Sequence, residues 1–412
     1  MADILTLKCS ICGAEYHDFM MYTCPHCGEV GTLDVLYDYA NLNIDRENIS
    51  NSKVFSMWRY KSLMPIQADS TVPPLRVGFT PLYDAPRIAE VLDVKQAWVK
   101  DDGLNPTGSL KDRASSMIVA RAMEHNISVV STASTGNAAA ALAGVSASVG
   151  MKPIIFVPAS APEAKIAQLL VYGATVLLVE DTYDTAFDLC MTMCIQEGWY
   201  SRNTGVNPFT IEGKKTVAYE IAEQLNWNIP DVVIVSVGDG NIIAGVYKGF
   251  YDLVQMGWIQ RIPRLIGVQS STSAPLVHAW ENNIQAAEMQ PISAHSIADS
   301  IVAGLPRDRS KALRAVRETN GALIAVDDAE ILAAIPQFAR LSGVFAEPAA
   351  AATWAGAQRA RTLGLLGKDE SIVILSTGSG LKDVKRAQES VTQGIRVQPN
   401  IQAIQSALQE LR

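Results

Sequence analysis

Residues 97–113 read Ala97-Trp-Val-Lys100-Asp-Asp-Gly-Leu-Asn105-Pro-Thr-Gly-Ser-Leu-Lys111-Asp-Arg113. The segment 97–100 predicts a buried strand, the Gly- and Pro-containing segment predicts a turn, and a helix is expected to begin near Lys111. A lysine at a helix N-terminus lies in a field that disfavours a cation, so its pKa falls. The neutral amine, which can form a Schiff base, is then favoured. The alternative is an ordinary solvated lysine on the surface.

Outward from this segment, short β-branched runs alternate with alanine-rich stretches that predict helices. The chain has 412 residues, which is room for two or three domains. Alternation at this spacing predicts an α/β fold made of parallel sheets with helices on both faces, arranged as two doubly wound domains with a ligand cleft between them. The expected strands are 97–100, 129–131, 153–157, 175–179, 232–237, 265–268 and 371–376.

Three more of these strands end in turns rich in glycine and hydroxyl groups. After the strand at 129–131, backbone N–H groups and hydroxyls at the start of an alanine-rich helix could hold an anion such as a carboxylate. The alternative is a simple helix N-cap, which needs one such residue. The loop after 232–237 could hold a phosphate, although a lone G-x-G is a weak signal. The residues concerned are Ser134, Thr135, Gly136 and Asn137, then Gly238, Asp239, Gly240, Asn241 and Ile242, and, after the strand at 371–376, Thr377.

Four of the six cysteines lie in the first 27 residues, as two C-x-x-C pairs that are each followed by glycine. Two such turns direct four thiolates at one point, the ligand set of a closed tetrahedral zinc site. We therefore predict a small zinc ribbon over residues 1–35, in which Zn²⁺ is structural because the segment is too short to fold on its own core. Two disulfides or a redox pair are the alternatives. The predicted ligands are Cys9, Cys12, Cys24 and Cys27.

Composition and charge narrow the class of protein. Hydrophobic residues make up 48% of the chain and charged residues 18%, which excludes a disordered protein. The net charge is −8 and there is no run of four basic residues, so no nucleic-acid partner is expected. The N-terminal residues do not resemble a signal peptide, and no apolar run is long enough to cross a bilayer. A cytoplasmic enzyme without a membrane partner is the expectation.

Taken together, these motifs resemble one family. Asn105–Arg113, the Ser-Thr-Gly-Asn-Ala turn at 134–138, Glu-Gly-Lys-Lys-Thr at 212–216, Gly-Asp-Gly-Asn-Ile at 238–242, Glu-Pro-Ala-Ala-Ala at 347–351 and Thr-Gly-Ser-Gly-Leu-Lys-Asp at 377–383 occur in this order. The set resembles the threonine synthase family of fold type II pyridoxal-phosphate enzymes, whose body is like the tryptophan synthase β subunit. Some members also carry an N-terminal cysteine ribbon. The resemblance covers nearly the whole chain.

The resemblance implies roles for individual residues. Lys111 would hold pyridoxal 5′-phosphate covalently and, once freed, move protons at Cα and Cβ of the substrate. The loop 238–242 would bind the cofactor phosphate, Asn137 would face the ring hydroxyl O3′, and Thr377 would meet the pyridine nitrogen. Ser134, Thr135 and Gly136 would bind the substrate.

The resemblance also implies a reaction on a small amino acid. The expected reaction is elimination of phosphate from O-phosphohomoserine and addition of water at Cβ, which gives L-threonine. The alternatives are a β-replacing synthase of the cysteate synthase kind, a threonine or serine ammonia-lyase, and a partner module that binds the cofactor without turnover. A homodimer is expected.

The expected body covers residues 79–412, with a connecting arm at 36–78. Its smaller subdomain is predicted at about 110–200 and its larger one at about 79–109 and 201–390.

Several positions depart from the family pattern. Ala138 stands where threonine is usual, and Thr182 and Asp188 stand where an asparagine and a basic residue usually hold the substrate phosphate. An acidic group near a phosphate dianion is repulsive. If these positions line the substrate pocket, the phosphate must be held weakly or by other groups, such as Lys214, Lys215 or Ser134.

Overall fold

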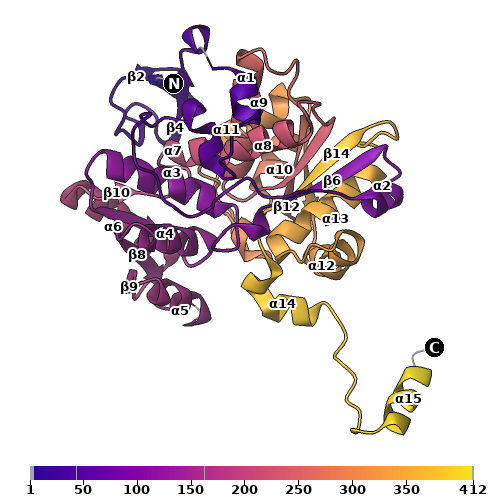
Figure 1. The fold of residues 1–412 in the computed structure, drawn as a ribbon. Helices are drawn as coiled ribbons and strands as arrows, with labels where there is room; N and C mark the ends of the chain where they lie inside the picture. Colours follow the sequence, from indigo (N-terminus) through magenta and orange to yellow (C-terminus); the bar gives the residue numbers. More distant parts are fainter. Residues whose placement is uncertain (1–3, 43, 162, 411–412) are drawn as a thin grey trace.

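The computed structural model describes residues 4–42, 44–161 and 163–410. Two parallel sheets with helices on both faces form the body, and a small antiparallel sheet near the N-terminus lies against it (Figure 1). The predicted α/β class with two sheets is confirmed. No helix in the described part of the chain is long and apolar enough to cross a membrane.

The large sheet has six strands in the order β13-β12-β11-β14-β6-β5, all parallel except the β5 edge. Its centre is β11, whose five residues are all buried, as expected for a strand covered on both faces. All four strands predicted for this sheet are present. The strands are β5 Leu82–Asp84, β6 Gln96–Asp101, β11 Val232–Ser236, β12 Arg264–Ser270, β13 Ala322–Val326 and β14 Ser371–Ser376.

Alternate side chains of β11 enter two separate hydrophobic cores. Val233 and Val235 pack into one core, whereas Val232 and Ile234 pack into the other. Each face is therefore closed by its own set of helices. The first core is covered by α8 Thr216–Gln224, α9 Asn241–Gln255, α10 Pro275–Glu281 and α11 Arg309–Glu318, and the second by α2 Pro86–Leu92, α12 Asp328–Ser342 and α13 Pro348–Thr362.

The small sheet has four parallel strands in the order β10-β7-β8-β9. Cys190 and Cys194, on the helix α6 (Tyr183–Glu197), are buried against it, which confirms that they are core thiols. The domain limits drawn from the sequence remain a prediction. The elements are β7 Val129–Ala133, β8 Lys152–Pro158, β9 Thr175–Val179 and β10 Tyr200–Ser201, with α3 Lys111–Glu124, α4 Asn137–Ala147, α5 Glu163–Val171, α6 Tyr183–Glu197 and α7 Phe209–Lys214.

The N-terminal sheet has the order β2-β1-β4-β3 and consists of β1 Ile4–Cys9, β2 Glu15–Tyr16, β3 Thr23–Cys24 and β4 Gly28–Tyr37. It is anchored to α11, where Lys311 Nζ donates to the Leu33 carbonyl at 2.6 Å and Arg314 pairs with Asp34 at 2.7 Å. The connecting arm then crosses the body as η1 Tyr39–Asn41, α1 Arg46–Ser50 and η2 Met57–Leu63.

The remaining elements are η3 Asp102–Leu104, η4 Asp299–Ile301, η5 Gly380–Asp383, α14 Val384–Glu389 and α15 Ile401–Gln409. Figure 1 shows α15 set apart from the body, at the end of an extended segment.

Candidate active site

The carboxyl ends of strands from both parallel sheets face one cavity of about 740 Å³. The turn after β7, the loop after β11 and the first residue of α3 all line it. This is where ligands bind in open α/β sheets. Among the predicted residues, those that line the cavity are Lys111, Ser134, Thr135, Gly136, Asn137, Gly238, Asp239, Gly240, Asn241 and Ile242.

Lys111 begins α3 at this cavity. Burial and then the nearby Arg202 guanidinium lower the pKa of Lys111 to about 8, although Glu347 and Asp239 act in the opposite direction. The direction agrees with the sequence prediction, but the largest cause is burial rather than the helix dipole. A lysine with this pKa supplies a neutral amine near neutral pH far more often than an exposed lysine does.

The turn 134–137 begins α4 (Asn137–Ala147). Gly136 N–H donates to Ser134 Oγ at 3.2 Å, so the turn is partly closed by its own hydroxyl. The Asn137 side-chain amide donates to both Glu347 carboxylate oxygens, at 2.9 and 3.0 Å, and to Ser300 Oγ at 3.3 Å. Glu347, at the N-cap of α13, is buried, and burial raises its pKa. The sequence places Glu347 in a motif but gives no indication that it holds Asn137.

The loop 238–242 approaches other backbone closely. A Cβ on Gly238 would lie 2.9 Å from Ile301 Cα, so only glycine fits beside the segment that crosses the loop there. Gly240 has φ +88°, a conformation that glycine adopts without strain, and it caps α9. The free N–H groups of the first turn of α9 therefore open onto the cavity, an arrangement suited to an anion.

Lys214 brings a buried cation to the same loop. A Cβ on Gly213 would lie 2.2 Å from the Arg113 carbonyl oxygen, so glycine is what lets α7 pack against α3 and place Lys214 at the cavity. Lys214 Nζ donates to Asn241 Oδ1. Burial, together with the cations Lys111 and Arg202, holds the pKa of Lys214 well below its usual value. From the sequence alone, Lys214 is only one of several candidates for holding a substrate phosphate.

The fit of pyridoxal phosphate can be tested on these residues. Lys214 is a fully buried cation with no ion pair among the described residues, and a phosphate next to the N–H groups of α9 would place an anion beside it. Ser236 Oγ, at the end of β11, lines the cavity and is buried without a hydrogen-bond partner among the described residues. Lys111 supplies the amine. The residues present fit the cofactor.

Four of the positions discussed lie outside the cavity lining. Lys215 is buried and forms ion pairs with Glu212 and Asp252, at 2.5 and 2.8 Å. Thr377 follows β14, is 6% exposed, and is joined to the site through its carbonyl oxygen, which accepts the Leu110 N–H at 2.9 Å. Thr182 and Asp188 are exposed and do not line the cavity, whereas Ala138 does. The repulsion expected from Asp188 therefore has no geometric basis at the cavity.

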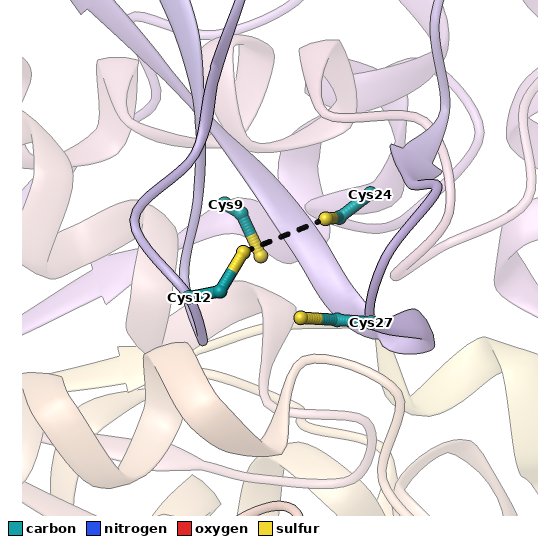
Figure 2. A group of neighbouring side chains, drawn as sticks. All are labelled: Cys9, Cys12, Cys24 and Cys27. Atoms are coloured by element: carbon teal, nitrogen blue, oxygen red, sulfur yellow. Dashed lines mark hydrogen bonds between the residues drawn. The ribbon is translucent and has the colours of Figure 1, made fainter.

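The four N-terminal cysteines form a separate cluster, with sulfur atoms within 4.8 Å of one another (Figure 2). The Cys12 and Cys24 sulfurs are 3.7 Å apart. Tetrahedral zinc with bonds of about 2.3 Å needs sulfur atoms about 3.8 Å apart, so the cluster fits such an ion. A Cβ on Gly31 would lie 2.6 Å from Cys27 Cβ, which explains a glycine under the cluster.

The fold and the lysine-lined cavity define a pyridoxal-phosphate dependent enzyme, and residues 74–378 match the family described by that name. The chain is 39% identical over 404 residues to the threonine synthase of Methanosarcina acetivorans, with 98% of each chain covered. It is 37% identical over 411 residues to that of Methanocaldococcus jannaschii, covering 98% of this chain and 99% of the relative. The chain belongs to the threonine synthase family.

Among solved structures, processed threonine deaminase isoform 2 from Solanum lycopersicum aligns with a TM-score of 0.64 at 22% identity, covering 76% of this chain and 82% of the deaminase. At this identity the likeness concerns the fold alone.

Proposed function

We propose that this chain is a threonine synthase, which converts O-phosphohomoserine and water into L-threonine and phosphate. In this reaction the C–O bond at Cγ breaks and phosphate leaves, Cβ loses a proton and Cγ gains one, and water adds its oxygen at Cβ. The observation that carries the proposal is Lys111, whose pKa is lowered to about 8 at the edge of a cavity that the buried Lys214 also lines. The full-length identity with threonine synthases supports the same reaction.

Bound pyridoxal phosphate supplies an electron sink that makes protons on an amino-acid substrate removable. We assign Lys111 to holding the cofactor and to moving protons at Cα and Cβ, because its amine lines the cavity and has a pKa lowered to about 8. The loop 238–242 and Lys214 would hold the cofactor phosphate. Asn137, held by Glu347, would face the ring hydroxyl, and Thr377 would face the ring nitrogen.

The turn Ser134–Thr135–Gly136 is the proposed seat of the substrate carboxylate. Its hydroxyl residues line the cavity at the start of α4, where the helix dipole favours an anion. Ala138 also lines the cavity and contributes no hydroxyl.

The test is an assay of the purified protein with O-phosphohomoserine, serine, threonine and O-phosphoserine. Phosphate, ammonia and amino-acid products are measured for each. We expect equal amounts of phosphate and threonine from O-phosphohomoserine. Ammonia from threonine or serine without phosphate release would instead identify an ammonia-lyase, and a replacement product from O-phosphoserine would identify a β-replacing synthase.

We further propose that the cysteine cluster holds one structural zinc ion. Four sulfur ligands complete a tetrahedral shell and leave no open position for catalysis. The six cysteines form no disulfide, which is consistent with the cytoplasm as the compartment. A homodimer and the absence of a nucleic-acid partner are proposed from the sequence.

Elemental analysis should find about one zinc per chain, and Cys24→Ser should abolish it, because three thiolates cannot close the site. The ribbon should loosen while the cofactor absorbance is retained. Cys190→Ser, a buried cysteine outside the cluster, is the matched control and should keep the metal. Loss of catalysis with the ribbon still folded would contradict the structural role.

A further inference from the structure

Arg307 is a cation at the cavity with no role in the site described so far. It lies in the loop before α11 and lines the cavity. Its guanidinium carbon is 3.6 Å from the centroid of the Phe187 ring on α6, and its backbone N–H donates to Asp239 Oδ1 at 3.3 Å. The side chain is therefore held against the small-sheet side of the cavity while its backbone is fixed to the glycine loop.

The other cations that line the cavity are already engaged. Lys214 donates to Asn241, and Arg309 donates to the carbonyls of Ala286 and Pro306 at 2.8 and 3.0 Å. Lys111 is assigned to the cofactor. Within the described residues, the Arg307 guanidinium makes no hydrogen bond to protein, and its side chain is 24% exposed.

Its ion pair is with Glu29, at 3.6 Å. Glu29 lies on β4 of the N-terminal ribbon, two residues after Cys27, and its side chain is 84% exposed. An ion pair this exposed is weak, and salt screens it further. A dianion that entered the cavity could therefore replace Glu29 at Arg307.

We infer that Arg307 binds the phosphate of the substrate and thereby selects a phosphorylated amino acid. The inference rests on the proposed function. A guanidinium presents two parallel N–H donors that match a phosphate, and stacking on Phe187 restricts its plane. Arg307 therefore brings a positive charge to the α6 side of the cavity, from the loop before α11.

The test compares three variants of the cofactor-loaded protein. Arg307→Gln removes the charge, Arg307→Lys keeps the charge without the planar fork, and Glu29→Gln removes the competing carboxylate. Each is assayed for kcat/KM with O-phosphohomoserine. Each is also titrated with the phosphonate in which carbon replaces the ester oxygen, and with unphosphorylated homoserine as the control ligand, by changes in cofactor absorbance.

Loss of one charge-assisted contact predicts a fall of about 30-fold in kcat/KM and in phosphonate affinity for Arg307→Gln. Arg307→Lys should lose less, and Glu29→Gln should gain about twofold. Homoserine affinity and cofactor content should not change. The opposite signs at Arg307 and Glu29 distinguish phosphate binding from a general loss of stability.

The inference is overturned if Arg307→Gln and Arg307→Lys bind the phosphonate like the wild type, or if Arg307→Gln loses cofactor, since Arg307 would then serve the cofactor phosphate. If Arg307→Gln does not fold, Arg307→Lys carries the test. If the wild type releases no phosphate from O-phosphohomoserine, the proposed function has failed. The phosphonate titration then still decides whether Arg307 binds a phosphate group.

Discussion

A partly buried lysine and a fully buried arginine lie two residues apart in the first turn of α3, and their surroundings differ. Lys111 lines the cavity, whereas Arg113 points away from it into the protein, because residues two apart on a helix do not share a face. Arg113 pairs with Asp102 at 2.6 Å and also with Glu220, and all three side chains are fully buried. Helix α3 thus separates a buried network, in which each charge has a partner of opposite sign, from the cavity, where Lys111 forms no ion pair among the described residues.

On the balanced side, every charge has a partner of opposite sign. Burial by itself would raise the pKa of Glu220, but Arg113 and Lys100 outweigh it and lower that pKa to about 2. Thr80 Oγ1 adds a hydrogen bond to Asp102 at 2.7 Å. A buried network of this kind holds the strand ends and α3 in one arrangement.

On the cavity side, neither Lys111 nor Lys214 forms an ion pair among the described residues, and burial and neighbouring cations lower the pKa of both. Charges that are balanced within the protein are structural, and charges left unbalanced indicate where an anionic ligand belongs. The following predictions test this distinction.

The largest effect is expected from Lys111→Met. Loss of the amine that holds the cofactor and transfers protons should lower kcat on the order of 10⁴-fold. The free energy of unfolding of the cofactor-free protein should not fall, because a partly buried amine that forms no ion pair among the described residues is replaced by an apolar side chain of similar length. Borohydride reduction of the wild type, followed by peptide mass spectrometry, should place the pyridoxyl group on Lys111.

A pyridoxyl group on another lysine would show that Lys111 is not the residue that holds the cofactor. Arg113→Met is the paired variant, because it removes the neighbouring cation on the other side of α3.

Arg113→Met should destabilise the protein by about 3–5 kcal/mol, because it leaves Asp102 and Glu220 charged, buried and without their guanidinium. Urea unfolding of wild type and variant measures the difference. Arg359→Met is the control: its pair with Glu330 is 41% and 34% exposed, and its loss should cost less than about 1 kcal/mol. An equal loss of unfolding free energy in Arg113→Met and Arg359→Met would contradict the proposed difference between buried and exposed ion pairs.

Much of the fold follows from local pattern. The β-branched run at 232–237 became β11, and the other six predicted strands are also present. The strand β13 was missed because Ala322-Leu-Ile-Ala-Val326 contains two alanines, which also suit a helix, and β5 was missed because it is a three-residue edge strand. Sequence periodicity detects strands that are long and rich in β-branched residues. It detects less well the short or alanine-containing strands, which form because they pair with neighbouring strands.

The residues of the candidate site could likewise be predicted only where a local sequence pattern marks them. The glycine loop and the turn at 134–137 directly follow β11 and β7, and Lys111 follows β6 after the short segment 102–110, so their meeting at one cavity could be predicted. Arg307 could not, because it lies in a loop without a motif and reaches the cavity only through tertiary packing on Phe187. Asp188 shows the reverse error: its position in the pattern suggested a pocket residue, yet it is exposed on α6.

The smallest effect expected is a pH dependence of the cofactor-free protein. Lys111 has a pKa of about 8 when folded and a usual value of 10.5, so between these pH values the unfolded chain binds a proton that the folded chain does not. The free energy of unfolding therefore rises with pH across this window and is lowest, as far as Lys111 contributes, below about pH 8. The pKa values of Lys214 and of Lys100 are also lowered, so the quantity to measure is the difference between wild type and variant.

Urea unfolding at pH 7.5, 8.5 and 9.5 should show a smaller rise in the free energy of unfolding for Lys111→Met than for the wild type. Adding cofactor should remove the difference in slope, because Lys111 then no longer titrates as a free amine. An identical slope in the cofactor-free wild type and Lys111→Met would show that Lys111 keeps an ordinary pKa and that the cavity side of α3 is as well balanced as the side of Arg113.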